Sequence, residues 1–166
     1  MLTLRLCKIM LLAGVALFFS LVAFGNITDY DSNWQFVQHV LSMDTTFANS
    51  TIRWRAVTNP TLQTLGYGLI ILVQTVIAIL LWIAVVRLLI NVRSDKFGPA
   101  KAIAVLGLTL GLLLYLVGFI AIGGEWFAMW QSQIWNGEQK AFDFISMIGI
   151  VMLIMFVPDE SRRAST

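Results

Sequence analysis

Four stretches of the chain are almost wholly apolar, and polar segments separate them. They cover residues 9–25, 67–86, 102–123 and 141–157. Each reaches about 17 residues, the lower limit for a helix that crosses a hydrocarbon core of about 30 Å. The fourth is short and carries Asp143 near one end, so it requires a locally thinned bilayer. The pattern predicts an all-α integral membrane protein built as a four-transmembrane-helix bundle.

Lysine and arginine gather on one side of the predicted spans. Eight of the eleven basic residues precede the first span, lie between the second and third, or follow the fourth. They are Arg5, Lys8, Arg87, Arg93, Lys96, Lys101, Arg162 and Arg163. Cytoplasmic segments of membrane proteins are rich in Lys and Arg, so we expect both termini and the loop 87–101 in the cytoplasm. Segments 26–64 and 124–140 are then outer loops of a single membrane domain, 1–166.

Composition supports a membrane protein and excludes several functions. Hydrophobic residues make up 58% of the chain and charged residues 12%, and the mean hydropathy is +0.83. Soluble domains carry about twice that share of charge. The net charge of +2 is not gathered into a basic patch, so nucleic acid is not an expected partner. Cys7 is the single cysteine, which excludes an intramolecular disulfide and a cysteine-based zinc cluster.

The first outer loop is too long for a simple turn, and its pattern predicts structure of its own. On a helical wheel of residues 34–43, the polar side chains fall within one arc of about 100°. They are Gln35, Gln38, His39 and Ser42. We expect an amphipathic helix along the membrane surface, capped by Asp31 or Ser32. Residues 51–57 alternate in character as a short strand does. The loops therefore predict a structured extracytoplasmic cap.

Tryptophan is concentrated in the two outer loops. Five of the six lie there, namely Trp34, Trp54, Trp126, Trp130 and Trp135. In the second loop, Trp126, Phe127, Trp130 and Ile134 would share one face of a helix. An aromatic belt at the headgroup level is one interpretation. A docking surface or an aromatic-lined pocket is the other, since Trp is also enriched at interface hot spots.

Two runs in the outer loops resemble a known family. The first run is Asp29-Tyr30, Asn33-Trp34 and residues 36–44 (FVQHVLSMD), followed by Trp54-Arg55-Ala56. The second run is residues 123–132 (GGEWFAMWQS), followed by Trp135-Asn136-Gly137. Over essentially the whole chain, the sequence is similar to a bacterial family of predicted small integral membrane proteins of unknown function. The resemblance implies four spans and a bacterial inner membrane, and it implies no activity.

The outer loops also hold the candidate ligand-binding residues. These are His39, Met43, Asp44, Glu125, Trp126 and Trp130. His39 and Met43 lie one helical turn apart and would suit a soft metal or haem. No second histidine completes such a site, so we expect neither a metal nor a cofactor. Ser42, His39 and Asp44 are the residue types of a hydrolytic triad, but side chains this close on one helix point apart. We therefore expect no enzyme.

The remaining candidate residues are structural. Arg53, Arg55, Glu138, Lys140 and Asp143 are expected to form salt bridges that fasten the outer loops, with a polar ligand pocket as the alternative. Four residues are expected to mediate helix packing, namely Gln74, Gly107, Gly111 and Gly118. A proton-coupled transporter normally needs an ionisable group deep in a span. None is present there, which argues against transport by this chain alone.

Two functions follow from these observations. The first is a non-catalytic accessory or assembly subunit that interacts through a tryptophan-rich outer face with membrane lipid and a membrane-protein partner or a second copy of itself. The alternative is a small-ligand or metal-binding membrane protein, or a transporter component, with an outer pocket. The sequence leaves the partner, the ligand and the oligomeric state open.

Overall fold

The computed structural model describes residues 2–159, and the chain in this range folds into helices joined by turns, with no strand. The helices are α1 (Leu2–Thr28), α2 (Tyr30–Ser42), the 3-10 helix η1 (Arg53–Arg55), α3 (Pro60–Ile90), α4 (Phe97–Leu113), the π-helix η2 (Leu114–Trp126), the 3-10 helix η3 (Met129–Gln131) and α5 (Glu138–Phe156). The predicted all-α membrane fold is confirmed.

Four helices are long and apolar enough to cross a membrane. They are α1, α3, the continuous pair α4 and η2, and α5, with 27, 31, 30 and 19 residues. The helices extend beyond the apolar stretches because capping, not hydropathy, determines where a helix begins. In α3, for example, Asn59 Oδ1 accepts hydrogen bonds from the Thr61 and Leu62 amides at 2.9 and 3.3 Å, and Pro60 occupies the first turn.

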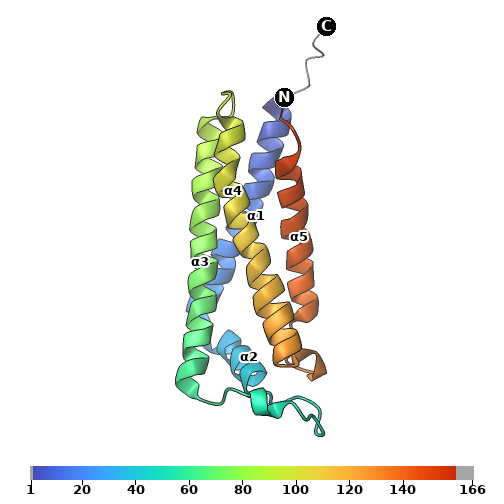
Figure 1. The fold of residues 1–166 in the computed structure, drawn as a ribbon. Coiled ribbons are helices and arrows are strands. Elements are labelled where there is room, and N and C mark those ends of the chain that lie inside the picture. Colours follow the sequence, from blue (N-terminus) through green and yellow to red (C-terminus); the bar gives the residue numbers. More distant parts are fainter. Residues whose placement is uncertain (1, 160–166) are drawn as a thin grey trace.

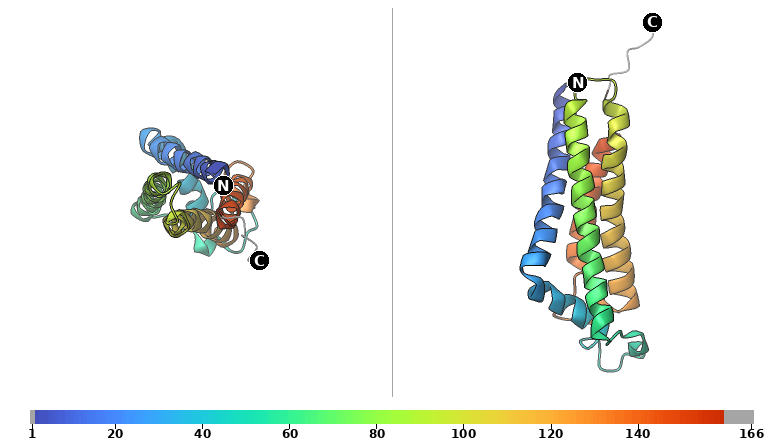
Figure 2. Two further views of the ribbon diagram at one scale, coloured as in Figure 1. Left: turned by 90° about the horizontal axis from the view of Figure 1, so that it is seen from above. Right: turned by 90° about the vertical axis from the view of Figure 1, so that its left-hand side faces the viewer.

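The four spanning helices form a closed bundle. Helix α1 packs on α3, α3 on α4, α4 on α5, and α5 returns to α1. The end-on view shows the helices around a common core (Figure 2). At one end lie Leu2 and Asp159, and we call it the terminal end. At the other end α2 lies across the bundle (Figure 1). We call α2 together with residues 43–59 and 125–137 the cap, and this end the cap end.

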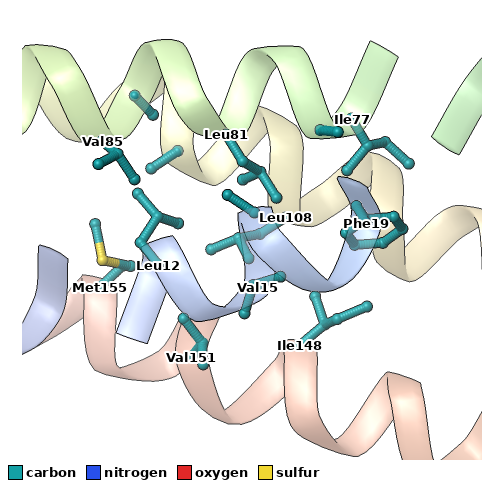
Figure 3. Packing of buried hydrophobic residues seen from close by; sticks show 14 of the residues in the cluster. Leu12, Val15, Phe19, Ile77, Leu81, Val85, Leu108, Ile148, Val151 and Met155 are labelled. Carbon is teal, nitrogen blue, oxygen red and sulfur yellow. The ribbon is translucent and has the colours of Figure 1, made fainter. Parts of the chain in front are cut away.

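The core of the bundle is apolar and tightly packed. Leu12, Phe19, Leu81, Leu108 and Ile148 are fully buried and meet between the four helices (Figure 3). Helix α4 approaches its neighbours through two of the predicted packing glycines. A Cβ at Gly107 would lie 2.7 Å from Leu81 Cδ2, and a Cβ at Gly111 would lie 2.9 Å from Phe19 Cζ. These contacts require small residues on α4.

A buried polar contact joins α1 to α3 near the cap end. The Asn26 side-chain amide donates to Gln74 Oε1 at 2.6 Å, and both side chains are buried. The Tyr67 hydroxyl donates to the Asn26 carbonyl oxygen at 3.2 Å. In hydrocarbon, polar groups have no water to bond and must find partners within the protein. The strongly polar group inside α3 is thus satisfied by another helix.

The cap differs in three details from the sequence-based expectation. The amphipathic helix begins at Tyr30 after Asp29, which accepts a hydrogen bond from the Ser32 hydroxyl, so neither Asp31 nor Ser32 is the capping residue. The expected strand at 51–57 is wrong. The Arg55 amide bonds to the Ile52 carbonyl within the η1 turn. Residues 126–134 do not form one helix, because the chain turns at Ala128, whose φ is 53°.

Hydrogen bonds connect the two halves of the cap to each other and to the bundle. Thr45 Oγ1 donates to Ser132 Oγ at 2.9 Å, and the Phe47 amide donates to Gln131 Oε1 at 3.1 Å. The Gln63 side chain, from the first turns of α3, donates to the Val57 carbonyl oxygen at 2.8 Å. Both outer loops are therefore part of one structure fastened to α3.

Substitution of Gly111 by alanine should destabilise the bundle. The new Cβ would press on the rigid, fully buried Phe19 ring, and overpacking of this kind costs about 1–3 kcal/mol. The control is Gly149→Ala, where a Cβ meets no atom within 4 Å. Thermal unfolding in detergent, followed by far-UV circular dichroism, measures both. Equal melting temperatures for the two variants would contradict the close contact.

Candidate functional site

An apolar pocket of about 540 Å³ lies at the cap end of the bundle, between α2, α3 and the α4–η2 helix. Every residue that lines it is hydrophobic or glycine. Helix α2 contributes one wall, and α3 and η2 contribute the others. Representative residues are Phe36 and Leu41 from α2, Leu69 and Val73 from α3, and Val117 and Ile122 from η2. The pocket can therefore hold a hydrocarbon group and offers nothing to a polar one.

The pocket exists because two neighbouring helices separate. Helix α4 packs against α3 near Gly107, but its continuation η2 packs against α5. Figure 1 shows the two helices diverging toward the cap end, where α2 lies across the gap. The change from α-helix to π-helix at Leu114 coincides with the divergence. Such π-helical turns are rare and are frequent at functional sites.

The rim of the pocket lies on the outer surface of the spanning helices. Leu69 is 60% exposed, and Leu113, Val117 and Ile122 are 47%, 44% and 46% exposed. All four also line the pocket. In a membrane, these surfaces face hydrocarbon rather than water. The pocket consequently opens sideways toward the acyl chains of the leaflet at the cap end.

Three of the candidate ligand-binding residues come together elsewhere in the cap. His39 Nδ1 lies 2.8 Å from Asp44 Oδ2, and the imidazole stacks on Trp135 with ring centroids 4.7 Å apart. Met43 is buried against Phe127. The cavity beside them measures about 10 Å³, which is room for about one water molecule. These side chains are engaged with one another rather than arranged around a ligand-sized space.

The other three candidates lie on the surface of the cap. Trp126 meets Trp54 edge-on at 6.1 Å, Trp130 meets Phe47 edge-on at 5.7 Å, and Glu125 is exposed. None of the six candidates lines the apolar pocket. Within residues 2–159, no group of three or more His, Cys, Asp or Glu side chains is placed to hold a metal ion.

The two cap arginines contact backbone carbonyl oxygens where salt bridges were expected. Arg53 Nη2 donates to the carbonyl oxygens of Thr46 and Phe47 at 3.0 and 3.2 Å. Arg55 Nη1 donates to the Trp126 carbonyl oxygen at 3.3 Å. Five residues were expected to form salt bridges, namely Arg53, Arg55, Glu138, Lys140 and Asp143. In the part of the chain that the structure describes, none of them takes part in an ion pair. The turns of the cap present free carbonyl oxygens closer to the guanidinium groups than any carboxylate.

A buried ion-pair cluster fastens the opposite, terminal end. Asp159 lies 2.5 Å from Lys8 Nζ and 2.6 Å from Lys101 Nζ, and the Lys8 side chain is fully buried. Lys8 also donates to the Val157 carbonyl oxygen, and Lys101 donates to that of Met155 at 3.0 Å. The cluster joins α1 and α4 to the chain that follows α5. It brings together residues from three separate parts of the sequence.

The sequence indicated Lys8 and Lys101 only as markers of membrane orientation, and Asp159 was not a candidate. The available signal was Lys8 itself, since a lysine at the edge of an apolar span requires a partner. Burial alone raises the pKa of Asp159. Hydrogen bonds from Lys101 and Lys8, and their charges, outweigh this and hold the pKa of that carboxyl below its ordinary value.

Comparison with protein families identifies the chain. Residues 4–158 match the model of a family described as "Predicted small integral membrane protein (DUF2165)". The chain belongs to this family. The match spans the whole bundle and the cap, and it confirms the resemblance seen in the two outer runs. The family description states membrane integration and no activity. Comparisons with curated proteins and with solved structures returned no match.

In this family member, Asp159→Asn should destabilise the fold at neutral pH. Removing the carboxylate leaves the buried Lys8 ammonium uncompensated, which costs roughly 3 kcal/mol. Because the pKa of Asp159 is lower in the folded state, its stabilisation is present at neutral pH and is lost as pH falls through that pKa. Thermal unfolding in detergent should therefore give a lower melting temperature for the variant than for the natural chain at pH 7. The difference should shrink below about pH 4.

The matched control is Asp95→Asn, an exposed acid at the same end. It should leave the melting temperature unchanged at both pH values. A loss of stability in Asp95→Asn equal to that in Asp159→Asn would show that general surface charge, not the cluster, is responsible.

Proposed function

We propose that this protein is a non-catalytic membrane protein that binds a bilayer lipid, with an acyl chain of the lipid in the apolar pocket beneath α2. One observation carries the proposal. The fold contains a preformed cavity of about 540 Å³ whose rim is on the lipid-facing surface of the bundle. Ligand sites typically measure about 300–1,000 Å³. The leaflet itself supplies acyl chains at this depth.

The lining determines the chemical class of the ligand. A polar ligand would leave its hydrogen-bonding groups unsatisfied against hydrophobic side chains, at a cost of several kcal/mol in hydrocarbon. Gln74, the strongly polar group of α3, already bonds to Asn26 and does not line the pocket. An acyl chain has no such groups. The pocket therefore favours a lipid over the polar ligand or metal considered from the sequence.

We further propose that the protein lies in a bacterial inner membrane with both termini and the α3–α4 turn in the cytoplasm. The support is the distribution of basic residues. Arg5, Lys8, Arg93, Lys96 and Lys101 lie at the terminal end, as the positive-inside rule requires of a cytoplasmic side. Two more, Arg162 and Arg163, lie outside the described residues. In this orientation, the cap is extracytoplasmic and the pocket opens into the outer leaflet.

A second candidate function is an accessory or assembly subunit that binds a membrane protein through the tryptophan-rich face of the cap. The exposure of the indoles on the cap favours this function. Trp54, Trp126 and Trp130 are 73%, 47% and 48% exposed, and Ile134, from the same outer loop as Trp126 and Trp130, is 76% exposed. Trp is enriched at interface hot spots. The two functions are compatible, because the pocket and the tryptophan face use different residues.

Filling the pocket should abolish lipid binding. Gly118→Leu and Gly66→Leu each add a side chain to the pocket, and at both positions the nearest atom to a new Cβ is at least 3.7 Å away. Native mass spectrometry of the chain extracted in a mild detergent should show a retained lipid. Retention should fall at least about ten-fold in both variants, which corresponds to about 1.4 kcal/mol of binding free energy.

The control for this experiment is Gly14→Leu, because a Cβ there meets no atom within 4 Å and Gly14 does not line the pocket. It should retain lipid as the natural chain does. Equal lipid retention in all four proteins would overturn the lipid-binding function. The same spectra report protein partners, and a stoichiometric partner that is lost in Trp130→Ala would establish the second candidate function.

Cysteine labelling tests the orientation. In a Cys7→Ser background, Asn49→Cys places a thiol on the exposed cap, and Asp95→Cys places one in the exposed turn between α3 and α4. A membrane-impermeant maleimide added to intact cells with a permeable outer membrane should label the first variant only. The second should react after the inner membrane is opened. The reverse pattern would place the cap in the cytoplasm.

A further inference from the structure

We propose that Arg55, which packs against Trp54 and Trp126, binds the phosphate of the lipid whose acyl chain occupies the apolar pocket. This inference rests on the proposed function and specifies its ligand as a phosphate-bearing lipid. The pocket explains the tail of such a molecule but contains nothing that recognises a headgroup. Arg55 offers the missing group at the cap end, where the headgroup of that leaflet lies.

Arg55 is connected to the pocket wall through its own side chain and through the two residues that follow it. Its Nη1 donates to the carbonyl oxygen of Trp126, and the next residue, Phe127, lines the pocket. The residues that follow Arg55, Ala56 and Val57, pack against the buried cluster to which Phe127 belongs. The Val57 amide also donates to the carbonyl oxygen of Leu41, another lining residue, at 2.8 Å. The guanidinium group thus lies one layer beyond the apolar wall.

The charge of Arg55 is not neutralised within the described residues. No carboxylate lies within ion-pair distance of it. Its guanidinium carbon is 4.7 Å from the ring centroid of Trp126 and 5.4 Å from that of Trp54, so two indoles attract the cation in place of a carboxylate. Its Nε is buried without a hydrogen-bond partner. Nε is thus out of a ligand's reach, whereas Nη2 makes no hydrogen bond among the described residues and is free to bind a ligand.

Phosphate fits this arrangement better than any other headgroup component. A guanidinium group presents a planar fork of N–H donors that matches two phosphate oxygens at once, and the hydrogen bonds are charge-assisted. Tryptophan beside it suits the headgroup level, where one edge of the indole is apolar and the N–H is wet. The neighbouring Arg53 differs, because it already donates to the carbonyl oxygens of Thr46 and Phe47 and to the Thr46 hydroxyl.

Two lipids with the same tails test the proposal. The full chain in a mild detergent is titrated with dioleoylphosphatidylglycerol or with dioleoylglycerol, which lacks the phosphate, and bound lipid is counted by native mass spectrometry. The natural chain should prefer the phospholipid by at least about ten-fold, the factor expected for charge-assisted hydrogen bonds. Arg55→Gln should bind both lipids as weakly as the natural chain binds dioleoylglycerol.

Two further variants keep the result interpretable. Arg55→Lys retains the positive charge and is therefore less prone to misfold than Arg55→Gln. It lacks the planar guanidinium fork, so it should lower the preference for the phospholipid. Lys140→Gln removes an exposed positive charge from the same end and should keep the natural preference. An unchanged preference in both Arg55 variants, or an equal loss in Lys140→Gln, would overturn the proposal.

The outcomes also separate this inference from the function on which it rests. Equal binding of both lipids by the natural chain would overturn the headgroup site and leave the acyl pocket supported. Binding of neither lipid would overturn both. Inorganic phosphate should not displace the phospholipid, because it has no tail to fill the pocket. Displacement would assign Arg55 to a free anion and overturn its role in lipid binding.

Discussion

The close approach of α4 to its neighbours at Gly107 and Gly111 is the contact on which the rest of the bundle depends. It lets Leu81 and Phe19 fill the space between helices, and it makes the terminal half of the structure dense. Beyond Gly111 the helix widens into a π-helix and turns toward α5. The gap left beside α3 is the apolar pocket. The continuous α4–η2 helix therefore provides both a close contact between helices and one wall of the apolar pocket.

The hydrocarbon surroundings of the helices explain how the polar groups are arranged. A charge or an amide in hydrocarbon is tolerated only with a partner, so Lys8 meets Asp159 and Gln74 meets Asn26. The first contact joins α1 to the chain that follows α5, and the second joins α1 to α3. Arg55, at the cap end, is the contrast, since two indoles and one carbonyl oxygen hold it without a carboxylate. A lipid phosphate would complete its set of partners.

The cap gives the pocket its shape. Without α2, the gap between α3 and η2 would be an open groove on the bundle. Helix α2 covers it at the cap end with Phe36, Val37, Val40 and Leu41. The hydrogen bonds of the cap loops hold α2 in that position. Lipid binding and docking of a protein partner would then affect the same element, because the tryptophan face and the pocket wall are joined at Trp126 and Phe127.

The sequence by itself determined the fold class and the four spans, because hydropathy is a local property that the bilayer converts into helices of the required length. It also indicated the family, through the two residue runs in the outer loops. The tertiary structure decided the rest. Whether Gly111 meets Phe19, whether Asp159 reaches Lys8, and whether Val117 and Leu69 enclose a cavity depend on how distant helices pack. The expected strand at 51–57 failed for the same reason. A strand needs a neighbouring strand, and residues 2–159 place none beside it.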